Sequence, residues 1–373
     1  MELSELISRY NVNGPRYTSY PTANLFQSGD WQTAYMNALH DLGHQNLALY
    51  VHVPFCPKIC YYCACNRIHT GNLERAQRYT NYLRREISLL AAHIGTNGRS
   101  AGAANVEQLH FGGGTPTFLS DDQFAELFVQ LATSFNLSRS ATRDFSIELD
   151  PRGLPPERLA LLAGLGFNRL SIGVQDFDPQ VQAAVNRLQS EQETAEVVTA
   201  ARRHGFRSIS FDLIYGLPQQ TVAGFATTLQ RVLQLEPDRL SIYSYAHLPE
   251  RFKSQRQIDA AHLPSADTKL QLLNLAVEVL EEAGFVYVGM DHFAKPSDSL
   301  VAAMKNRTLH RNFMGYSSHG DCQLLGLGAS SIGQTGSLYV QNVKDLDSYY
   351  RALDAHQFPL ERGYQLEFDD QIR

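Results

Sequence analysis

Four of the five cysteines of this chain lie within ten residues, and this crowding constrains the fold more than any other feature. They are Cys56, Cys60, Cys63 and Cys65, and they closely follow a strand-like run from residue 47 to residue 53. A disulfide framework would need cysteines spread over a small secreted chain, whereas this chain has 373 residues and an odd number of cysteines. We therefore expect the loop that carries them to hold a metal centre.

The spacing of the cysteines distinguishes two kinds of metal centre. Structural zinc usually takes two ligand pairs separated by a long spacer, and no second pair of Cys or His lies at a suitable distance. Iron–sulfur clusters can be held by thiolates from one compact loop. The C-x3-C-x2-C spacing of Cys56, Cys60 and Cys63 thus favours an iron–sulfur cluster. A zinc-stabilised barrel without catalytic activity stays open as an alternative.

Strand-like and helix-like patterns alternate from residue 47 onward, which predicts βα units and a parallel sheet. The expected strands are 47–53, 106–111, 144–149, 169–174, 208–213, 239–245 and 286–290. The expected helices include 73–93, 120–135, 222–235 and 265–283, the second with Ser120 as its N-cap. Three Gly-Phe pairs, at 166, 205 and 284, each close a helix in the same way. This repeat favours one barrel over separate domains.

Polar residues gather where the expected strands end. In parallel barrels the carboxyl ends of the strands carry the site, because loops and helix N-termini converge there. The residues at these ends are Glu148, Asp150, Gln175, Asp176, Asp212, Asp291 and His292. The turn Gly112-Gly113-Gly114-Thr115 ends the second strand, and glycines let the backbone approach a ligand closely. This turn matches neither a dinucleotide fingerprint nor a P-loop.

Composition excludes some classes of partner and indicates a cellular location. The net charge is −6, and no Lys/Arg run alternates with aromatic residues, so nucleic acid is not an expected partner. No apolar run approaches the roughly 20 residues that a membrane helix needs, so no membrane is expected either. The first residues lack the pattern of a signal peptide. We expect a cytoplasmic protein, since thiols stay reduced there.

The chain resembles the oxygen-independent coproporphyrinogen III oxidases, radical S-adenosylmethionine enzymes of anaerobic heme synthesis. The resemblance covers nearly the whole sequence. It rests on Gly14-Pro-Arg-Tyr-Thr-Ser-Tyr-Pro21, Cys56 to Cys65, the Gly-Gly-Gly-Thr-Pro-Thr turn, Ile147-Glu-Leu-Asp-Pro151, Gly173-Val-Gln-Asp-Phe177, Asp212-Leu-Ile-Tyr-Gly-Leu-Pro218, Tyr245-Ala-His-Leu-Pro249 and Gly289-Met-Asp-His-Phe293. Together these motifs are very specific.

The resemblance implies an α/β fold, a partial parallel (β/α)6-type barrel. It would span residues 47–335 with the cluster loop at 54–70, after an extended N-terminal arm at 1–46. Residues 336–373 would begin a C-terminal region. The family's helical C-terminal domain is expected to be largely absent, so the chain looks truncated.

The resemblance also implies the site residues. Cys56, Cys60 and Cys63 would hold a [4Fe–4S] cluster whose fourth iron binds S-adenosylmethionine, while Cys65 has no assigned role. A first S-adenosylmethionine and the cluster would lie beside Tyr50 and Tyr62, with further contacts to Gly113, Glu148 and Ile332. A second S-adenosylmethionine would contact Gly114, Thr115, Gln175, Arg187, Asp212 and Ala246.

The implied activity is the oxidative decarboxylation of two propionate groups of coproporphyrinogen III to vinyl groups, giving protoporphyrinogen IX. A 5′-deoxyadenosyl radical would start each round. A reduced electron donor such as flavodoxin or ferredoxin is the expected partner, and the chain is expected to be a monomer. By their chemistry alone, Arg16, Arg67 and Arg311 are candidates to bind the substrate carboxylates.

Two further functional alternatives stay open. A heme chaperone shares the C-x3-C-x2-C core but usually lacks the extra cysteine and the Pro-Arg-Tyr-Thr-Ser-Tyr-Pro arm, and both features are present here. A catalytically incomplete fragment is the other. His52 is expected only to satisfy the core, and Cys322 to be a buried free thiol.

Overall fold

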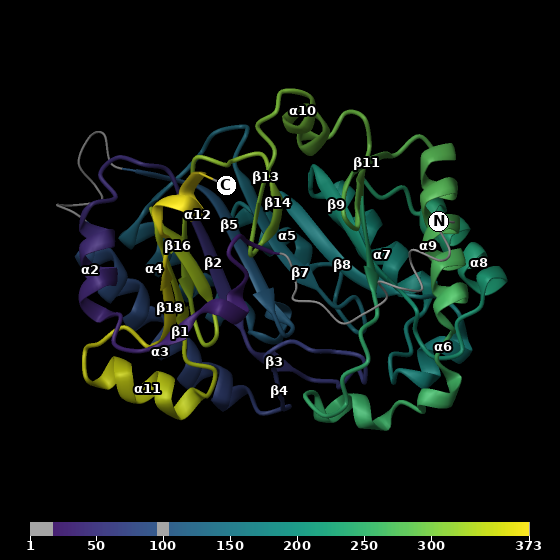
Figure 1. Ribbon diagram of the computed structural model, residues 1–373, viewed down its shortest axis with the longest axis horizontal. Coiled ribbons are helices and arrows are strands. Elements are labelled where there is room, and N and C mark those ends of the chain that lie inside the picture. Colours follow the sequence, from purple (N-terminus) through teal and green to yellow (C-terminus); the bar gives the residue numbers. More distant parts are fainter. Residues whose placement is uncertain (1–17, 95–103, 373) are drawn as a thin grey trace.

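A curved sheet of parallel strands organises the computed structural model, which describes residues 18–94 and 104–372 (Figure 1). Six of the described strands are parallel neighbours in sequence order. They are β2 (Leu47–Val53), β5 (Asn105–Gly113), β7 (Asp144–Leu149), β8 (Arg169–Gln175), β9 (Ser208–Tyr215) and β10 (Arg239–Ser244). The expected strands are thus found at their predicted places, and the sheet is the expected partial barrel.

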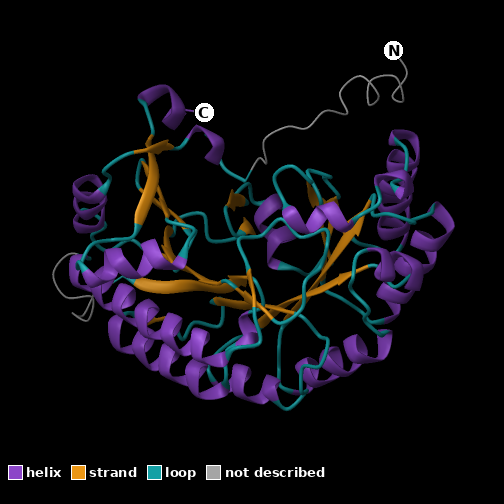
Figure 2. Ribbon diagram, turned by 90° about the horizontal axis from the view of Figure 1, so that it is seen from below, coloured by secondary structure: helices purple, strands orange, loops and turns teal. Residues whose placement is uncertain are grey.

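Helices follow the parallel strands and lie along the convex side of the sheet (Figure 2). They are α3 (Leu73–His93), α4 (Asp121–Ser134), α5 (Arg158–Gly164), α6 (Pro179–Ala184), α7 (Glu191–Arg203), α8 (Val222–Gln234) and α9 (Ala266–Glu282). Ser120 caps α4 as predicted, in a capping box with Gln123. Ser265 caps α9 through the N–H of Thr268. Local capping therefore fixes where these helices start.

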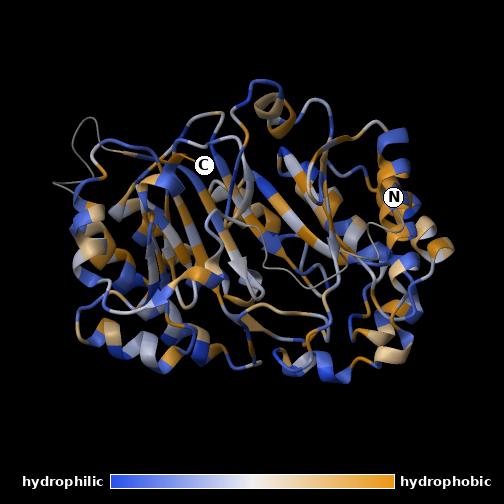
Figure 3. Ribbon diagram, in the orientation of Figure 1, coloured by the Kyte–Doolittle hydropathy of each residue, from blue (hydrophilic) through white to orange (hydrophobic). Residues whose placement is uncertain are grey.

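The central strands alternate between polar and apolar side chains, which is unusual for a parallel sheet. In β7 the apolar residues Phe145, Ile147 and Leu149 are buried, while the intervening polar residues are partly exposed. The same alternation occurs in β8. In Figure 3 the central strands change repeatedly between hydrophobic and hydrophilic colours. One face of the sheet thus packs under helices, and the other presents polar groups to the inside of the partial barrel.

Both edges of the parallel series differ from a simple βα repeat. The expected strand 286–290 is β11 (Val286–Gly289), but its neighbour is the antiparallel strand β12 (His292–Ala294), and β12 pairs with β10. The reason is a tight reversal at Gly289 and Met290, both of which have positive φ. At the other edge, β15 (Gln323–Leu327) pairs in parallel with β2. Other strands therefore flank both β2 and β10, and the barrel stays open.

The region after β15 extends the same sheet. β16 (Ile332–Thr335), β17 (Leu338–Asn342) and β18 (Leu360–Gln365) are antiparallel neighbours, and β18 pairs with β1 (Gln27–Ser28). The expected division after residue 335 falls in the turn of the β16–β17 hairpin. The expected arm contains α2 (Gln32–His40), a helix that the sequence analysis does not predict and that buries Tyr35 and Leu39. Residues 1–17, which include Arg16, lie outside the described residues.

The remaining short elements connect these parts. They are η1 (Ala23–Leu25), β3 (Phe55–Cys56), β4 (Ile68–His69), η2 (Pro116–Phe118), β6 (Asn136–Leu137), η3 (Lys253–Gln257), η4 (Ala260–His262), α10 (Ser299–Lys305), β13 (His310–Asn312), β14 (Gly315–Ser317), α11 (Leu346–Asp354) and α12 (Phe368–Ile372). Within the described ranges, no helix is both long and apolar enough to cross a membrane.

A buried carboxyl ties the C-terminal strands to the barrel. Glu86 on α3 accepts hydrogen bonds from the N–H of Gly328 at 2.7 Å, the Asn342 amide at 2.7 Å and the Tyr349 hydroxyl at 2.6 Å. Its burial raises its pKa to about 7, although these hydrogen bonds oppose the rise. The β15–β16 turn, β17 and α11 thus meet at one side chain.

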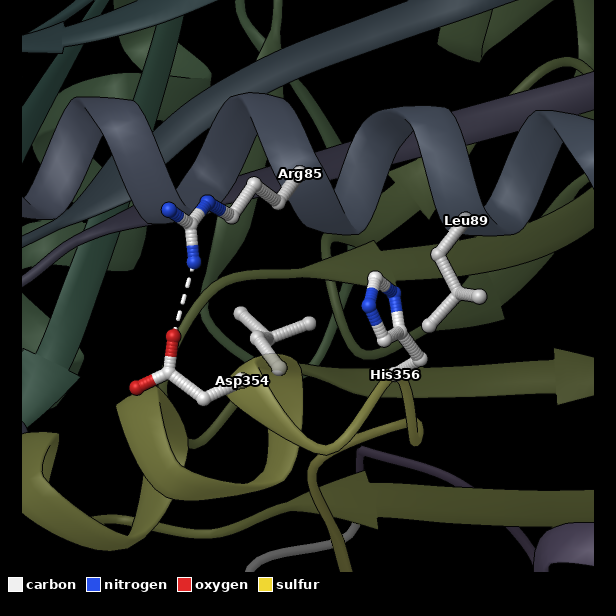
Figure 4. Close-up of a pocket in the computed structure, with 5 residues that line it drawn as sticks. Arg85, Leu89, Asp354 and His356 are labelled. Atoms are coloured by element: carbon white, nitrogen blue, oxygen red, sulfur yellow. Dashed lines mark hydrogen bonds and ion pairs between the residues drawn. The ribbon is translucent and has the colours of Figure 1, made fainter.

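A small surface pocket lies where α3 faces α11 (Figure 4). Its volume is about 160 Å³, and it is lined by Arg85, Leu89, Leu353, Asp354 and His356. The Arg85 guanidinium contacts the Asp354 carboxylate at 2.7 Å inside this lining. An ion pair between exposed side chains adds little to stability.

Candidate metal centre and cofactor site

The cysteine loop begins at the carboxyl end of β2 and returns on itself through a short parallel pair. Strands β3 and β4 pair Cys56 with His69, and the N–H of Thr70 donates to the carbonyl of Cys56 at 3.1 Å. Between these ends, Cys60 is buried and Cys63 is partly buried. The structure thus places all three predicted ligand thiols on one closed loop at the rim of the barrel.

Cations and hydroxyls surround the thiols. Arg152 and Arg187 donate to the sulfur of Cys60 at 3.5 and 3.4 Å, and the Thr115 hydroxyl lies 3.6 Å from the sulfur of Cys56. A hydrogen bond with Cys65, the larger cause, and nearby Arg67 lower the pKa of Cys63 to about 6. Burial raises the pKa of Cys56 to about 11. The hydrogen bond between Cys63 and Cys65 also raises the pKa of Cys65, so these two thiols act as a pair. A metal would displace the protons of the thiols that bind it.

This donor set fits an iron–sulfur cluster. In a [4Fe–4S] cluster each cysteine binds a different iron, so the three thiols share one loop without meeting at one point. Over residues 18–94 and 104–372, no three His, Cys, Asp or Glu side chains are arranged to hold a single metal ion. Positive charge from Arg152 and Arg187 suits thiolates that carry a net negative cluster.

The glycine turn packs directly against the cysteine loop. The N–H groups of Gly114 and Thr115 donate to the carbonyls of Val53 and Phe55 at 2.8 and 2.7 Å. A Cβ on residue 114 would lie 2.6 Å from the Phe55 carbonyl oxygen. The glycines are expected to let a ligand approach, and in the structure Gly114 lets the protein's own backbone approach.

A carboxylate faces the inside of the barrel beside this turn. Glu148 accepts a hydrogen bond from the N–H of Gly113 at 3.2 Å and lies 3.2 Å from Nε2 of His110. The His110 ring stacks on Tyr50, with 5.8 Å between the ring centroids. Burial favours the neutral acid, but the bonds from His110 and Gly113 outweigh it and lower the pKa of Glu148. An ionised acceptor and an aromatic ring therefore lie on either side of His110, and their contact with one cofactor stays a prediction.

The residues expected to hold a second cofactor meet around the ends of β8 and β9. Gly173 pairs with Asp212, and its carbonyl accepts from Arg187 at 2.6 Å. Asp212 accepts from the Ser171 hydroxyl at 2.8 Å, and burial raises its pKa to about 6. Gln175 has a positive φ of 68° at a bulge of β8. Arg187 also lies 3.4 Å from the sulfur of Cys60, so this group adjoins the cysteine loop through Arg187.

Ala246 and Tyr62 belong to separate segments that a buried amide joins. The Gln255 amide donates to the carbonyl of Tyr62 at 3.0 Å and to that of Ala246 at 3.2 Å. Its oxygen accepts from the N–H of Leu248 at 2.6 Å. Gln255 is 1% exposed, so its three bonds form a dry link between the cysteine loop and the end of β10.

The remaining predicted residues lie at different distances from the loop. Ile332 begins β16 and packs its backbone against Gly326, which pairs with Tyr50. Arg67 belongs to the cysteine loop and donates to the Cys60 carbonyl at 3.2 Å. Arg311 lies on the β13–β14 hairpin, where it covers the ring of Tyr316. A role for either arginine toward substrate stays a prediction.

His110 and three further residues at the site were not predicted from sequence. His52 was expected only to satisfy the core, yet its ring joins the Tyr50 hydroxyl and the Asn66 carbonyl, each at 3.0 Å. Arg152 and Gln255 carry no motif at all. The polar and apolar alternation of the strands was a usable signal, because it marks a sheet face that opens on a polar interior.

Comparison with known proteins agrees with this geometry. The Radical SAM superfamily model matches residues 50–232. The oxygen-independent coproporphyrinogen III oxidase of Pseudomonas aeruginosa is 50% identical over 373 residues, covering 99% of this chain and 80% of the relative. The Escherichia coli K12 relative of that name is 46% identical over 368 residues, covering 99% and 79%.

A solved structure is similar over the same range. It is coproporphyrinogen III oxidase (HemN) from Escherichia coli, described as a radical SAM enzyme. The TM-score is 0.91 at 45% sequence identity, and the match covers 96% of this chain and 80% of that chain. Identity and fold agree over nearly the whole sequence, and this chain belongs to the oxygen-independent coproporphyrinogen III oxidase family of radical SAM enzymes.

Proposed function

We propose that this chain is an oxidoreductase of heme biosynthesis that converts coproporphyrinogen III to protoporphyrinogen IX without oxygen. Each of two propionate groups loses CO2, one hydrogen atom to the 5′-deoxyadenosyl radical and one electron to an external electron acceptor, and becomes a vinyl group. The observation that carries the proposal is a loop of three thiols that contacts a glycine turn, which in turn bonds an ionised carboxylate, inside a fold shared with enzymes of this name. Radical chemistry needs this kind of enclosed, pre-arranged site.

The roles of the chain's residues follow from their contacts. When bound, the reduced cluster and S-adenosylmethionine supply a 5′-deoxyadenosyl radical that removes a hydrogen atom from the propionate β-carbon. Cys56, Cys60 and Cys63 would hold the cluster. Glu148 is ionised, so it can accept hydrogen bonds from the amino group of the cofactor, while Tyr50 offers an aromatic wall. Orientation by these groups lowers the entropy cost of the reaction.

A second S-adenosylmethionine is part of the proposal. Its contacts would be Gly114, Thr115, Gln175, Arg187, Asp212 and Ala246. The hydrogen bonds that join Arg187 to Gly173, and Gly173's pairing with Asp212, support a common binding surface. Carboxylate and guanidinium groups near the barrel interior can bind the hydroxyl and carboxylate groups of such a ligand.

The partners follow from the chemistry. A cluster of this kind needs one electron at a time, so we propose a reduced flavodoxin or ferredoxin as the donor. A monomer in the cytoplasm suits a cluster whose thiols must stay reduced. These assignments rest on the cluster and on the family.

The test is an anaerobic reconstitution. The purified chain is loaded with iron and sulfide and its visible absorption is recorded. S-Adenosylmethionine, a one-electron reductant and coproporphyrinogen III are then added, and 5′-deoxyadenosine and porphyrin products are measured. We expect a cluster, cleavage of S-adenosylmethionine and products that have lost one and two carboxyl groups. Cys60→Ala serves as the control and should show none of these. Tight heme binding without decarboxylation would instead support the chaperone, and zinc in place of iron would support a non-catalytic barrel.

A further inference from the structure

Arg152 points its guanidinium at a ligand thiol, although no expectation from sequence involves it. Its Nη2 lies 3.5 Å from the sulfur of Cys60, and Nη1 of Arg187 lies 3.4 Å from the same sulfur. The two arginine side chains are only 3% and 7% exposed. Two buried cations thus converge on one of the three thiols.

The Asp150 carboxylate bonds both arginines and offsets one of their two positive charges. It accepts from Nε of Arg152 at 2.9 and 3.1 Å and from Nη2 of Arg152 at 2.5 Å. Arg187 contacts the same carboxylate at 3.4 Å. The two arginines together hold the pKa of Asp150 below its usual range although burial opposes this, so the carboxylate is ionised. Two positive charges against one negative charge leave about one net positive charge beside Cys60.

The turn that carries Arg152 fixes its direction. The N–H of Arg152 donates to Asp150 Oδ1 at 3.1 Å, and Pro151 between them restricts the backbone. Arg187 has a different anchor, because its Nη2 also donates to the Gly173 carbonyl at 2.6 Å. Arg152 therefore has the carboxylate and the sulfur as its two partners, and a side chain held by such a double contact costs little entropy to orient.

We propose that Arg152 is a positioning residue that raises the reduction potential of the cluster held by Cys56, Cys60 and Cys63. Reduction adds one electron to a cluster that is already negative. A hydrogen-bonding cation at a ligand sulfur stabilises the reduced form more than the oxidised form, and burial strengthens this effect. Arg152 then brings the cluster within reach of its electron donor. The inference rests on the proposed function, since it needs Cys60 to be a cluster ligand.

Three variants test the proposal. Arg152→Gln removes the charge but keeps a hydrogen-bonding group of similar reach. Arg152→Lys keeps the charge without the forked contact. Arg158→Gln is the matched control, because Arg158 is a largely buried arginine (side chain 14% exposed) on α5 that pairs with Asp121 and donates to the Thr117 carbonyl. Iron and sulfide are measured in every reconstituted protein first, and midpoint potentials then follow from redox titration monitored by electron paramagnetic resonance.

We expect the midpoint potential of Arg152→Gln to be more negative than that of the unchanged protein. The value for Arg152→Lys should lie between them. Arg158→Gln should lower the stability of the protein and leave the potential unchanged, because its loss is purely structural. Equal potentials in Arg152→Gln and the unchanged protein would overturn the proposal and leave Arg152 as a support for Asp150.

The proposal and the proposed function fail in different ways. If the unchanged protein assembles no cluster, the proposed function fails and the inference fails with it. If the unchanged protein assembles a cluster but neither Arg152 variant does, the guanidinium is needed to hold Cys60 in place, and tuning of the potential is refuted. Only a potential shift at normal iron and sulfide content supports the inference.

Discussion

The imidazole ring of His52 fills the space that a side chain on Gly113 would need. A Cβ on residue 113 would lie 2.4 Å from Cε1 of His52, and Gly113 has a φ of +109°. The ring cannot easily move, because Tyr50 and Asn66 hold its two nitrogens. The middle glycine of the turn is thus required by packing between β2 and β5 as well as by backbone geometry.

We therefore predict that Gly113→Ala is strongly destabilising, by about 2–4 kcal/mol from backbone strain and overlap together. Urea unfolding under reducing conditions measures the loss. Gly43→Ala is the control, because Gly43 also has a positive φ, of +58°, but nothing lies within 4 Å of its Cβ position. Adding His52→Ala to Gly113→Ala should restore only the part of the stability loss that overlap with the His52 ring causes. An equal loss in the Gly113 and Gly43 variants would contradict the steric explanation.

Much of the fold could be predicted because its signals are local. The apolar alternation of 144–149 and the cap at Ser120 are properties of neighbouring residues, and both are found where expected. The edges of the sheet could not be predicted in this way. Pairing of β15 with β2 joins residues 323–327 to residues 47–51, and β12 displaces β11 because of a turn at Met290. Such pairings depend on tertiary packing rather than on local pattern.

The site residues likewise divide into those that short motifs predict and those that only tertiary contacts reveal. The thiols and strand-end acids belong to short motifs. In the structure Glu148 accepts from the glycine turn. Arg152 and Arg187 link Asp150 to the sulfur of Cys60. Asp176 instead accepts from Gln220 and Thr228 beside α8. Arg152 reaches Cys60 across 92 positions, and Gln255 reaches Tyr62 across 193 positions. Neither residue type is diagnostic of a site, because Arg and Gln are usually exposed. Their roles became visible only through burial and hydrogen bonding.

Substitution should distinguish the three predicted cluster ligands from the other two cysteines. Changing Cys56, Cys60 or Cys63 to Ser, one at a time, removes one protein ligand of the cluster and should abolish its visible absorption after reconstitution. Cys322→Ser should keep the full absorption, since Cys322 lies outside the loop. Cys65→Ser should also keep it, because three loop thiols suffice. Retention of a full cluster in any of the first three variants would show that the ligand set is wrong.

Asp212→Asn should affect cofactor binding and spare the cluster. Asp212 lies on β9 and accepts from Ser171, and an amide of the same size keeps this acceptor while removing the negative charge. We expect unchanged iron content and at least tenfold weaker binding of S-adenosylmethionine at one of two sites, about the loss of one charged hydrogen bond. Calorimetry on the reconstituted protein measures both the affinity and the number of sites. Two unaffected sites, or a single site in the unchanged protein, would remove Asp212 from the second cofactor.

The buried carboxyl of Glu86 should make stability depend on pH. Its folded pKa is raised to about 7 by burial, above the unfolded value of 4.5, so the folded state binds more protons between these values. The contribution of Glu86 to the free energy of unfolding is therefore complete below pH 4.5 and is lost as the pH rises through 7. At about 1.4 kcal/mol for each pKa unit, the loss is about 3 kcal/mol. Glu86→Gln cannot ionise. The free energy of unfolding of Glu86→Gln relative to the unchanged protein should thus rise by about this amount between roughly pH 5 and pH 8.

Glu126→Gln, which removes an exposed carboxylate paired with Arg84, should show a nearly constant difference over the same range. A constant difference for Glu86→Gln as well would mean that its three hydrogen bonds keep Glu86 ionised in the folded protein.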